Sequence, residues 1–214
     1  MNVSPSKENI LKKIRKALSN STPIPFPNSE GNNSIFHPSL QDLEIEFAQQ
    51  FTKLQGKFIY CLNTRELGVQ LNNLIQNYSW TKIFCCEEKL ASVLKDDLQI
   101  SCPHNDLATC DASITSCEFL VARTGSIILS AGQESGRTVS VYAPIHICIA
   151  YSDQLVYDIK DGLQLLKGKY QQSLPSLITF ATGPSRTADI EKTLVVGVHG
   201  PKEVYVFLVD SKTT

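Results

Sequence analysis

The stretch Lys57-Phe58-Ile59-Tyr60-Cys61-Leu62 decides the fold, because an apolar run of this length between two helical patterns is typical of a buried strand. A helix is expected before it, at residues 40–54, and another after it, at residues 64–76. A second apolar run at residues 81–86 and a helix near residues 88–95 continue the alternation. Strands that alternate with helices form βαβ units, so the sequence predicts an α/β domain with a mostly parallel sheet flanked by helices.

The pattern changes in the second half of the chain. Short runs rich in β-branched residues, separated by turns, stand at residues 119–122, 126–130, 139–142 and 146–151. Their spacing favours an antiparallel hairpin region added to the sheet. A loop is expected before them, at residues 103–110. A helix is expected after them at residues 154–168, followed by buried strands at residues 176–181 and 204–209.

The first 38 residues are expected to form a helical arm and a linker outside the α/β domain, which spans residues 39–214. The pattern of residues 4–19 predicts a helix with an apolar stripe on one face and basic side chains on the rest of its surface. Residues 20–38 contain four prolines among Asn and Ser, which predicts an extended linker. Such a helix either docks on its own domain or a partner subunit, or contacts lipid or RNA. The sequence leaves both alternatives open.

Composition excludes several classes of protein. The chain has 214 residues and a net charge of −1, which fits one domain and gives no overall field to attract nucleic acid. It has no apolar run long enough to cross a bilayer and no signal peptide at its start. Seven cysteines without a secretion signal indicate the cytoplasm. The absence of a C-x-x-C motif predicts no metal or iron–sulfur cluster in this chain.

Known catalytic and nucleotide-binding motifs are also absent from the sequence. It contains no G-x-x-x-x-G-K-[ST] loop and no G-x-G-x-x-G fingerprint for nucleotide phosphates. It also lacks a G-x-S-x-G nucleophile elbow and an H-E-x-x-H zinc motif.

Two dense blocks of small, hydroxyl and basic residues predict a binding site. The first begins at Ala122-Arg123-Thr124-Gly125-Ser126 and ends at Pro144-Ile145-His146. The second joins residues 182–191 to Gly197-Val198-His199-Gly200-Pro201. A helix beginning near Asp189, after the strand at 176–181, would offer N–H groups to an anion at a strand end.

These blocks supply the candidate site residues. The expected substrate-binding residues are Thr124, Gly125, Ser126, Arg137, Gly183, Ser185, Arg186, Thr187 and Asp189. The guanidinium of Arg186 suits a carboxylate or phosphate, but it would equally stabilise the turn by pairing with Asp189. The expected proton carriers are His146 and His199. The alternative for His146, which lies in an apolar strand, is a core residue with satisfied hydrogen bonds.

The same blocks resemble the LUD-domain family, in its lactate-utilisation protein C type. The resemblance covers residues 40–210. It rests on the Thr124-Gly125-Ser126 turn, on Gly136-Arg137 with Pro144-x-His146, on residues 183–191, and on Gly197-x-His199-Gly200-Pro201. It implies a fold like that of CoA transferases and sugar-phosphate isomerases. It also implies a cytoplasmic complex that oxidises L-lactate, or a related 2-hydroxy acid, to pyruvate.

In that system the iron–sulfur clusters belong to partner subunits. This chain would bind a small anionic metabolite, and the resemblance is compatible with a homo-oligomer. One residue departs from the family pattern, because Arg123 stands where an acidic residue is usual. The departure weighs against covalent catalysis by a carboxylate. Two other functions stay open: a non-catalytic assembly subunit for iron–sulfur partners, and a stand-alone binder or enzyme for a CoA thioester or sugar phosphate.

Overall fold

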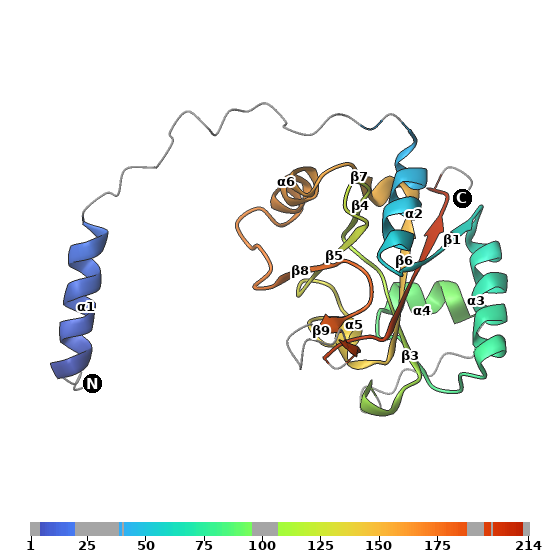
Figure 1. The fold of residues 1–214 in the computed structure, drawn as a ribbon, viewed down its shortest axis with the longest axis horizontal. Helices are drawn as coiled ribbons and strands as arrows, with labels where there is room; N and C mark the ends of the chain where they lie inside the picture. The colour runs from blue at the N-terminus through green and yellow to red at the C-terminus, as the bar shows by residue number, and fades with distance from the viewer. Residues whose placement is uncertain are drawn as a thin grey trace. The chain divides into compact units, whose positions relative to one another are not determined.

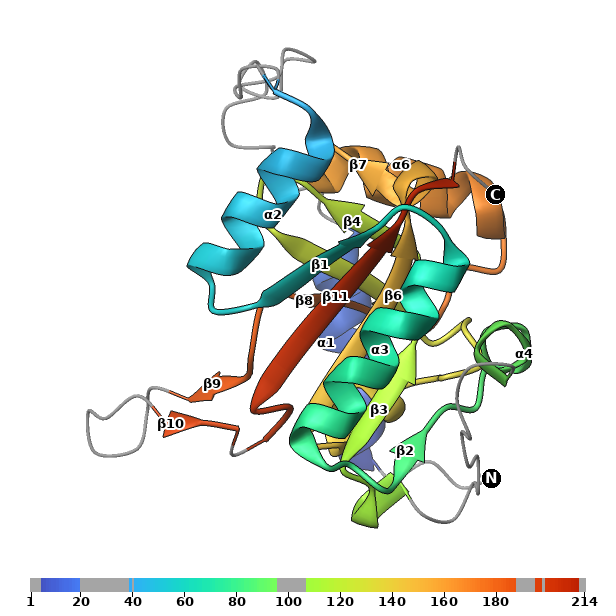
Figure 2. The same ribbon diagram turned by 90° about the vertical axis from the view of Figure 1, so that its right-hand side faces the viewer.

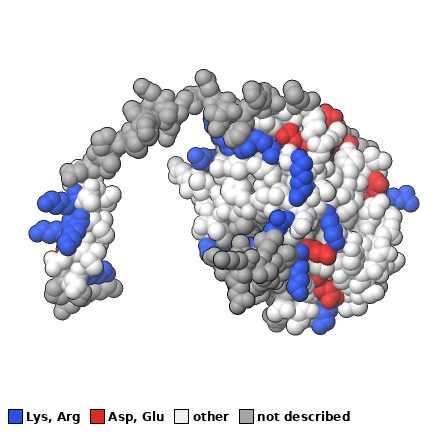
Figure 3. All heavy atoms as spheres, viewed as in Figure 1, with Lys and Arg blue, Asp and Glu red and all other residues white. Residues whose placement is uncertain are grey.

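The computed structural model describes residues 5–19, 39, 41–95, 107–187, 195–197 and 199–211. The chain divides into two compact units, Met1–His37 and Pro38–Thr214 (Figure 1). In the first unit, α1 (Pro5–Leu18) exposes the apolar side chains of Ile10, Ile14 and Leu18. Its basic side chains gather on part of the helix surface, whereas both charges are mixed on the visible face of the second unit (Figure 3).

A five-stranded parallel sheet forms the centre of the second unit (Figure 2). Its strands lie in the order β1 (Lys57–Cys61), β11 (Glu203–Val209), β6 (Ile145–Tyr151), β3 (Ala112–Thr115) and β2 (Ile83–Phe84). Because all five strands run the same way, their carboxyl ends share one edge of the sheet. The mixed α/β fold with a mostly parallel sheet, predicted from the sequence, is confirmed.

The two faces of this sheet are covered differently. One face packs against α3 (Thr64–Tyr78) and α4 (Glu88–Lys95), through side chains such as Leu67 and Leu94. The other face packs against α2 (Leu43–Lys53) and a second sheet, with Phe47 and Phe51 fully buried between them. Burial of these large side chains is the main stabilising contribution.

The second sheet contains the predicted antiparallel region. Its strands lie in the order β7 (Leu155–Val156), β4 (Phe119–Val121), β5 (Ser126–Ser130) and β8 (Ile178–Ala181). The pairs β4–β5 and β5–β8 are antiparallel, and β4–β7 is parallel. Helix α6 (Ile159–Tyr170) covers its outer face through Leu163 and Leu166. The antiparallel pair β9 (Arg186–Thr187) and β10 (Val195–Val196) stands apart from both sheets.

Several element predictions are wrong in type or place. Residues 139–142 form helix α5 (Val139–Tyr142), because one helical turn buries Val139 against Phe84 and Ala143. Strand β6 belongs to the central parallel sheet and not to a hairpin. The helix predicted at 154–168 starts later, after a 3-10 turn (Ser152–Gln154) and β7.

Two further predictions need correction. Strand β8 was expected to be buried, but Phe180 is exposed. The sequence pattern missed β3, whose four residues are all buried.

The loop at 103–110 is described only from Leu107, where a 3-10 turn (Leu107–Thr109) begins. No helix among the described residues is long and apolar enough to cross a membrane.

Candidate functional site

A groove of about 660 Å³ opens at the carboxyl ends of three parallel strands. Glu87 follows β2, Ser116 follows β3 directly, and Tyr151 is the last residue of β6. The described residues that line the groove come from these strand ends, α4, the loop after β5 and the end of α6; they are Glu87, Lys89, Leu90, Val93, Ser116, Gly132, Gln133, Glu134, Tyr151, Lys169 and Tyr170. In open α/β sheets, ligands bind outside the carboxyl ends of the strands. This groove is therefore the strongest candidate for a ligand site.

The loop after β5 is fixed to the strand ends by side-chain hydrogen bonds. Gln133 donates from Nε2 to Ser116 Oγ over 3.1 Å and accepts from the Ser130 amide at 2.9 Å. Glu134 Oε2 accepts from the amide of Glu88, in the first turn of α4, at 2.7 Å. A carboxylate is favourable there because a helix amino end carries unpaired N–H groups and partial positive charge. The wall of the groove is thus held in place before any ligand binds.

Glu87 is a buried carboxylate at the groove. Its Oε1 accepts from the Ser116 amide at 3.0 Å. No hydrogen bond from a described residue reaches its other carboxylate oxygen. A buried carboxylate is stabilised by every donor it gains, so this oxygen suits a hydroxyl or amide of a ligand.

Glu118 forms a second buried carboxylate, beneath the lining residues of α6. Ser130 and Tyr170 donate hydroxyl hydrogen bonds to it, and Lys169 Nζ donates at 2.7 Å. Burial by itself raises the pKa of Glu118, but the hydrogen bonds from these donors outweigh it and hold that pKa below its ordinary value. Burial likewise lowers the pKa of Lys169, but the bond to Glu118 raises it above the ordinary value. Both groups are therefore charged at neutral pH.

The groove combines charges of both signs. Two lysines, Lys89 and Lys169, and two glutamates, Glu87 and Glu134, line it. Such a lining can hold the acid group of a ligand with a lysine while a carboxylate accepts from a hydroxyl of the same ligand. Among the described residues, no three His, Cys, Asp or Glu side chains are grouped so that they could hold a metal ion.

Several predicted site residues gather around the end of α2 and not at the groove. Gly125 and Gly183 both have positive φ angles, of 60° and 86°. A Cβ on Gly125 would lie 2.6 Å from the backbone nitrogen of Phe51, and one on Gly183 would lie 2.6 Å from the carbonyl oxygen of Leu54. Both glycines are needed where the turns approach the helix backbone.

The polar residues of the same turns also have partners within the protein. Thr124 Oγ1 donates to Ser126 Oγ at 2.8 Å, and Ser126 shares a 2.9 Å hydrogen bond with Thr182. Arg186 donates from a terminal nitrogen to the carbonyl of Leu54 at 2.7 Å, where α2 ends. A cation at a helix carboxyl end is stabilising. The two motif blocks therefore do meet, but at a helix end.

The other two arginines of interest make separate contacts. Arg123, at the position where the family pattern is acidic, forms an ion pair with Asp158 at 2.6 Å. Asp158 is the N-cap of α6, so Arg123 fixes the start of that helix. Arg137 donates to Ser176 Oγ at 2.6 Å and lies just before α5.

His146 lies in the core, but described residues satisfy only one of its two ring nitrogens. It is 1% exposed, and its Nε2 is 2.8 Å from the Thr115 hydroxyl oxygen. Its Nδ1 and the hydroxyl of the adjacent Ser113 have no hydrogen-bond partner in the described part of the chain. Burial lowers the pKa of His146 to about 4, so the ring is neutral at neutral pH. It sits at the amino end of β6, roughly 16 Å along the strand from Tyr151 at about 3.3 Å per residue.

His199 lies in a shallow hollow of about 450 Å³ with Tyr142 and Lys202, on the exposed turn before β11. Ser185 contacts the same turn: its amide donates to the Pro201 carbonyl at 3.0 Å, and its carbonyl accepts from the Gly197 amide at 2.9 Å. Thr187 pairs with Val195 in the β9–β10 ladder. Asp189, and with it the helix expected there, lies outside the described residues. The placement of the predicted site residues thus falls into separate regions, and their roles in binding stay predictions.

The sequence patterns missed the residues of the groove. Glu87, Ser116 and Gln133 do not form a motif. Glu87 and Ser116 come together because β2 and β3 are neighbours, and Gln133 joins them from the loop after β5 of the second sheet. A correct assignment of β3 would have placed Ser116 and Glu87 at adjacent strand ends. No comparable signal marks Lys169 or Tyr170, which reach the site from the far end of α6.

Comparison with known proteins supports the family resemblance. Residues 87–209 match the model of the LUD domain. The "Lactate utilization protein C" of Deinococcus radiodurans is 35% identical over 118 residues, which cover 55% of this chain and 54% of that protein. The protein of the same name from Halalkalibacterium halodurans is 36% identical over 104 residues, 48% of this chain and 45% of that protein. The chain thus spans about half the length of the curated relatives it matches.

A solved structure supports the fold. The crystal structure of a duf162 family protein from Deinococcus radiodurans superposes with a TM-score of 0.60 at 20% identity, covering 78% of this chain and 96% of the other. The match to the LUD domain model covers more than half of the residues and includes every described residue of the groove. The chain belongs to the LUD domain family.

Proposed function

We propose that this chain acts in lactate utilisation, as a cytoplasmic subunit of a complex that oxidises L-lactate or a related 2-hydroxy acid to pyruvate. The names of its relatives support the first part of the proposal. The groove at the carboxyl ends of β2, β3 and β6 is proposed to bind the anionic metabolite. One observation carries this assignment: the groove lies entirely within residues 87–209, the part shared with the family.

The chemistry of the groove suits a 2-hydroxy acid. The carboxylate of the ligand would pair with Lys89, because Lys169 is already paired with Glu118. The hydroxyl of the ligand would donate to the oxygen of Glu87 that has no described partner. In this proposal the electrons pass to iron–sulfur subunits, and this chain holds no cluster. Iron and labile sulfide should therefore be absent from the anaerobically purified chain, and stoichiometric iron would contradict that part of the proposal.

A larger ligand is a second candidate, favoured by the size of the groove. Its volume of about 660 Å³ lies within the range of about 300–1,000 Å³ typical of sites for drug-sized ligands. A three-carbon acid would fill only part of it. A CoA thioester or sugar phosphate, or a segment of a partner subunit, would occupy more of the lining.

Calorimetric titration of the full chain with L-lactate, pyruvate and CoA tests the proposal. Lys89→Met should weaken the binding of the preferred ligand about tenfold, as expected for one lost charge-assisted hydrogen bond. Lys95→Met is the matched control, because Lys95 lies on the same helix but does not line the groove. Equal loss in both variants, or none in Lys89→Met, would contradict the site assignment.

Growth provides the test in cells. A bacterial strain that lacks its own lactate utilization protein C should regain growth on L-lactate with this chain, but not with its Glu87→Gln, Lys89→Met variant. If the variant restores growth as well as the unaltered chain, an assembly role is the better account.

A further inference from the structure

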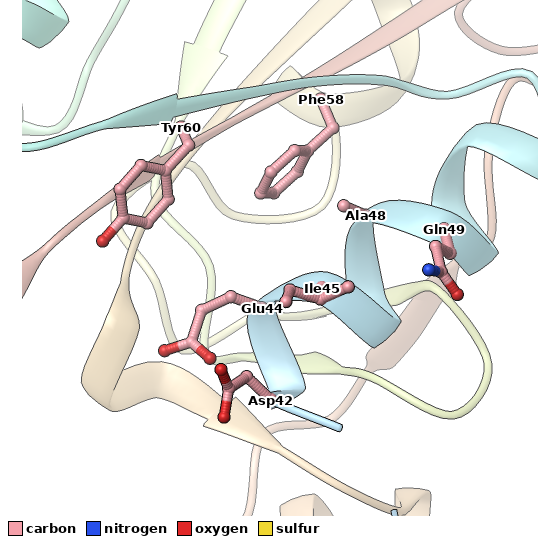
Figure 4. Close-up of a pocket in the computed structure, with 7 residues that line it drawn as sticks. All are labelled: Asp42, Glu44, Ile45, Ala48, Gln49, Phe58 and Tyr60. Carbon is pink, nitrogen blue, oxygen red and sulfur yellow. The ribbon is translucent and has the colours of Figure 1, made fainter. Parts of the chain in front are cut away.

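A second groove, of about 620 Å³, lies between α2 and β1, outside the residues that match the LUD domain. Figure 4 shows its lining: the rings of Phe58 and Tyr60 project from β1, and the amino-terminal half of α2 faces them. The remaining lining residues come from α2 and its start; they are Asp42, Glu44, Ile45, Ala48 and Gln49.

The floor of this groove is apolar and firmly held. Phe58 and Tyr60 are two residues apart on the strand, so both side chains lie on the same face. The Phe58 ring packs against the buried Phe47 ring, with 5.9 Å between their centroids. Tyr60 and Ile45 nevertheless remain 42% and 49% exposed. Apolar surface is therefore left uncovered above a rigid floor.

The rim of the groove is acidic. Asp42 occupies the N-cap position of α2, but its side chain makes no capping hydrogen bond. Asp42 and Glu44 both line the groove from the start of α2 (Figure 4). Neither carboxylate forms an ion pair with a residue that the structure describes. Burial, and then the carboxylates of Asp210 and Glu44, raise the pKa of Tyr60. The rim thus favours a cation.

The adjoining strand has an open edge. In the described sheet β1 is the outermost strand and pairs only with β11, in parallel. Backbone N–H and C=O groups along the outer edge of such a strand are available to another extended segment. Strand addition of this kind obtains affinity from main-chain hydrogen bonds and specificity from pockets for alternate side chains.

We propose that the open edge of β1 binds an extended segment of a partner protein, which carries a bulky apolar residue and, two positions along, a lysine or arginine. The segment continues the sheet beyond β1. Its apolar side chain covers Ile45, Phe58 and Tyr60, and its cation pairs with Asp42 and Glu44. Both side chains point toward α2, because alternate residues of a strand share a face.

The proposal is testable by NMR titration of the full chain with the peptide acetyl-Thr-Val-Thr-Lys-Thr-Val-Thr-amide. Amide shifts are expected in residues 57–61 and 42–49. A control peptide with Glu in place of Lys should bind at least tenfold more weakly. A peptide N-methylated on alternate backbone nitrogens, which cannot form the ladder, should also lose binding.

A variant of the protein tests the acidic rim. The double variant Asp42→Asn, Glu44→Gln should bind the lysine peptide about tenfold more weakly. Its affinity for the metabolite bound at the carboxyl-end groove should be unchanged. The proposal is overturned if the peptide does not bind, if shifts lie elsewhere, or if the Glu and N-methylated peptides bind as well as the first. The proposal of a partner protein is also overturned if the chain dimerises through β1 in the absence of peptide, in a concentration-dependent way. The edge of β1 would then bind a second copy of this chain.

Discussion

The carboxyl-end groove and the cluster around the end of α2 differ in what their polar residues do. At the groove, the carboxylates and lysines line an open hollow of about 660 Å³. At the end of α2, Gly125, Gly183 and Arg186 contact the backbone of Phe51 and Leu54. A dense sequence motif can thus serve close packing, while the residues that line a groove can come from positions scattered along the chain.

The largest expected effect is a loss of stability in variants of the turns that pack against the end of α2. Gly125→Ala should lower the free energy of unfolding by about 4 kcal/mol, because the new Cβ adds a backbone clash to an unfavourable positive φ. Gly136→Ala is the control: its φ is 62°, but a Cβ there has nothing within 4 Å, so about 1 kcal/mol is expected. Chemical denaturation measures both. Similar losses in the two variants would show that close approach to α2 is unimportant.

A second effect concerns the pH dependence of stability. The pKa of His146 is about 4 in the folded chain and about 6.5 when unfolded. The unfolded state therefore binds the extra proton first, and stability present above pH 6.5 is lost as the pH falls toward 4. The loss is about 3 kcal/mol by linkage.

Urea denaturation at pH 7 and pH 4 measures this loss. His146→Gln keeps a polar group for Thr115 but cannot titrate, so its stability should fall less over the same interval. An equal fall in the variant would mean that His146 is not the group responsible.

The smallest effect distinguishes the two interpretations of Arg186. Arg186→Ala should cost about 1 kcal/mol of stability, the usual contribution of one hydrogen bond, because it leaves the Leu54 carbonyl without this donor. Arg186→Lys should cost less, since it keeps a cation near the end of α2. Metabolite affinity, measured by calorimetry, should be unchanged in both. A marked loss of affinity with normal stability would restore Arg186 as a ligand anchor.

Much of the fold could be predicted from local pattern. The bounds of α4 and β5 follow from strong apolar periodicity, as do the parallel βαβ units around β1. Strand β3 was missed because its small residues, Ala112 and Ser113, give little strand signal, although the sheet buries them completely. Residues 139–142 looked like a strand because Val139 and Val141 are β-branched. Tertiary packing overrode that preference.

The site was less predictable than the fold. Gly125 and Gly183, which come from different motif blocks, approach the same helix end, whereas His146, Arg137 and His199 lie elsewhere. The meeting point of the two glycine turns could not be derived, because it depends on where α2 ends relative to them. Glu118 stood near the motif in sequence, but its contacts with Lys169 and Tyr170 span more than fifty residues and exist only in the folded chain.

Mapping a bound metabolite on the full chain tests most directly whether ligands bind at the carboxyl-end groove. NMR amide shifts should be followed during titration with pyruvate and, separately, with CoA. The preferred ligand should shift the amide signals of Glu87, Ser116 and Gln133 and leave those of Gly183 and Arg186 unchanged. Shifts confined to Gly125, Gly183 and Arg186 would contradict it and place the ligand at the end of α2.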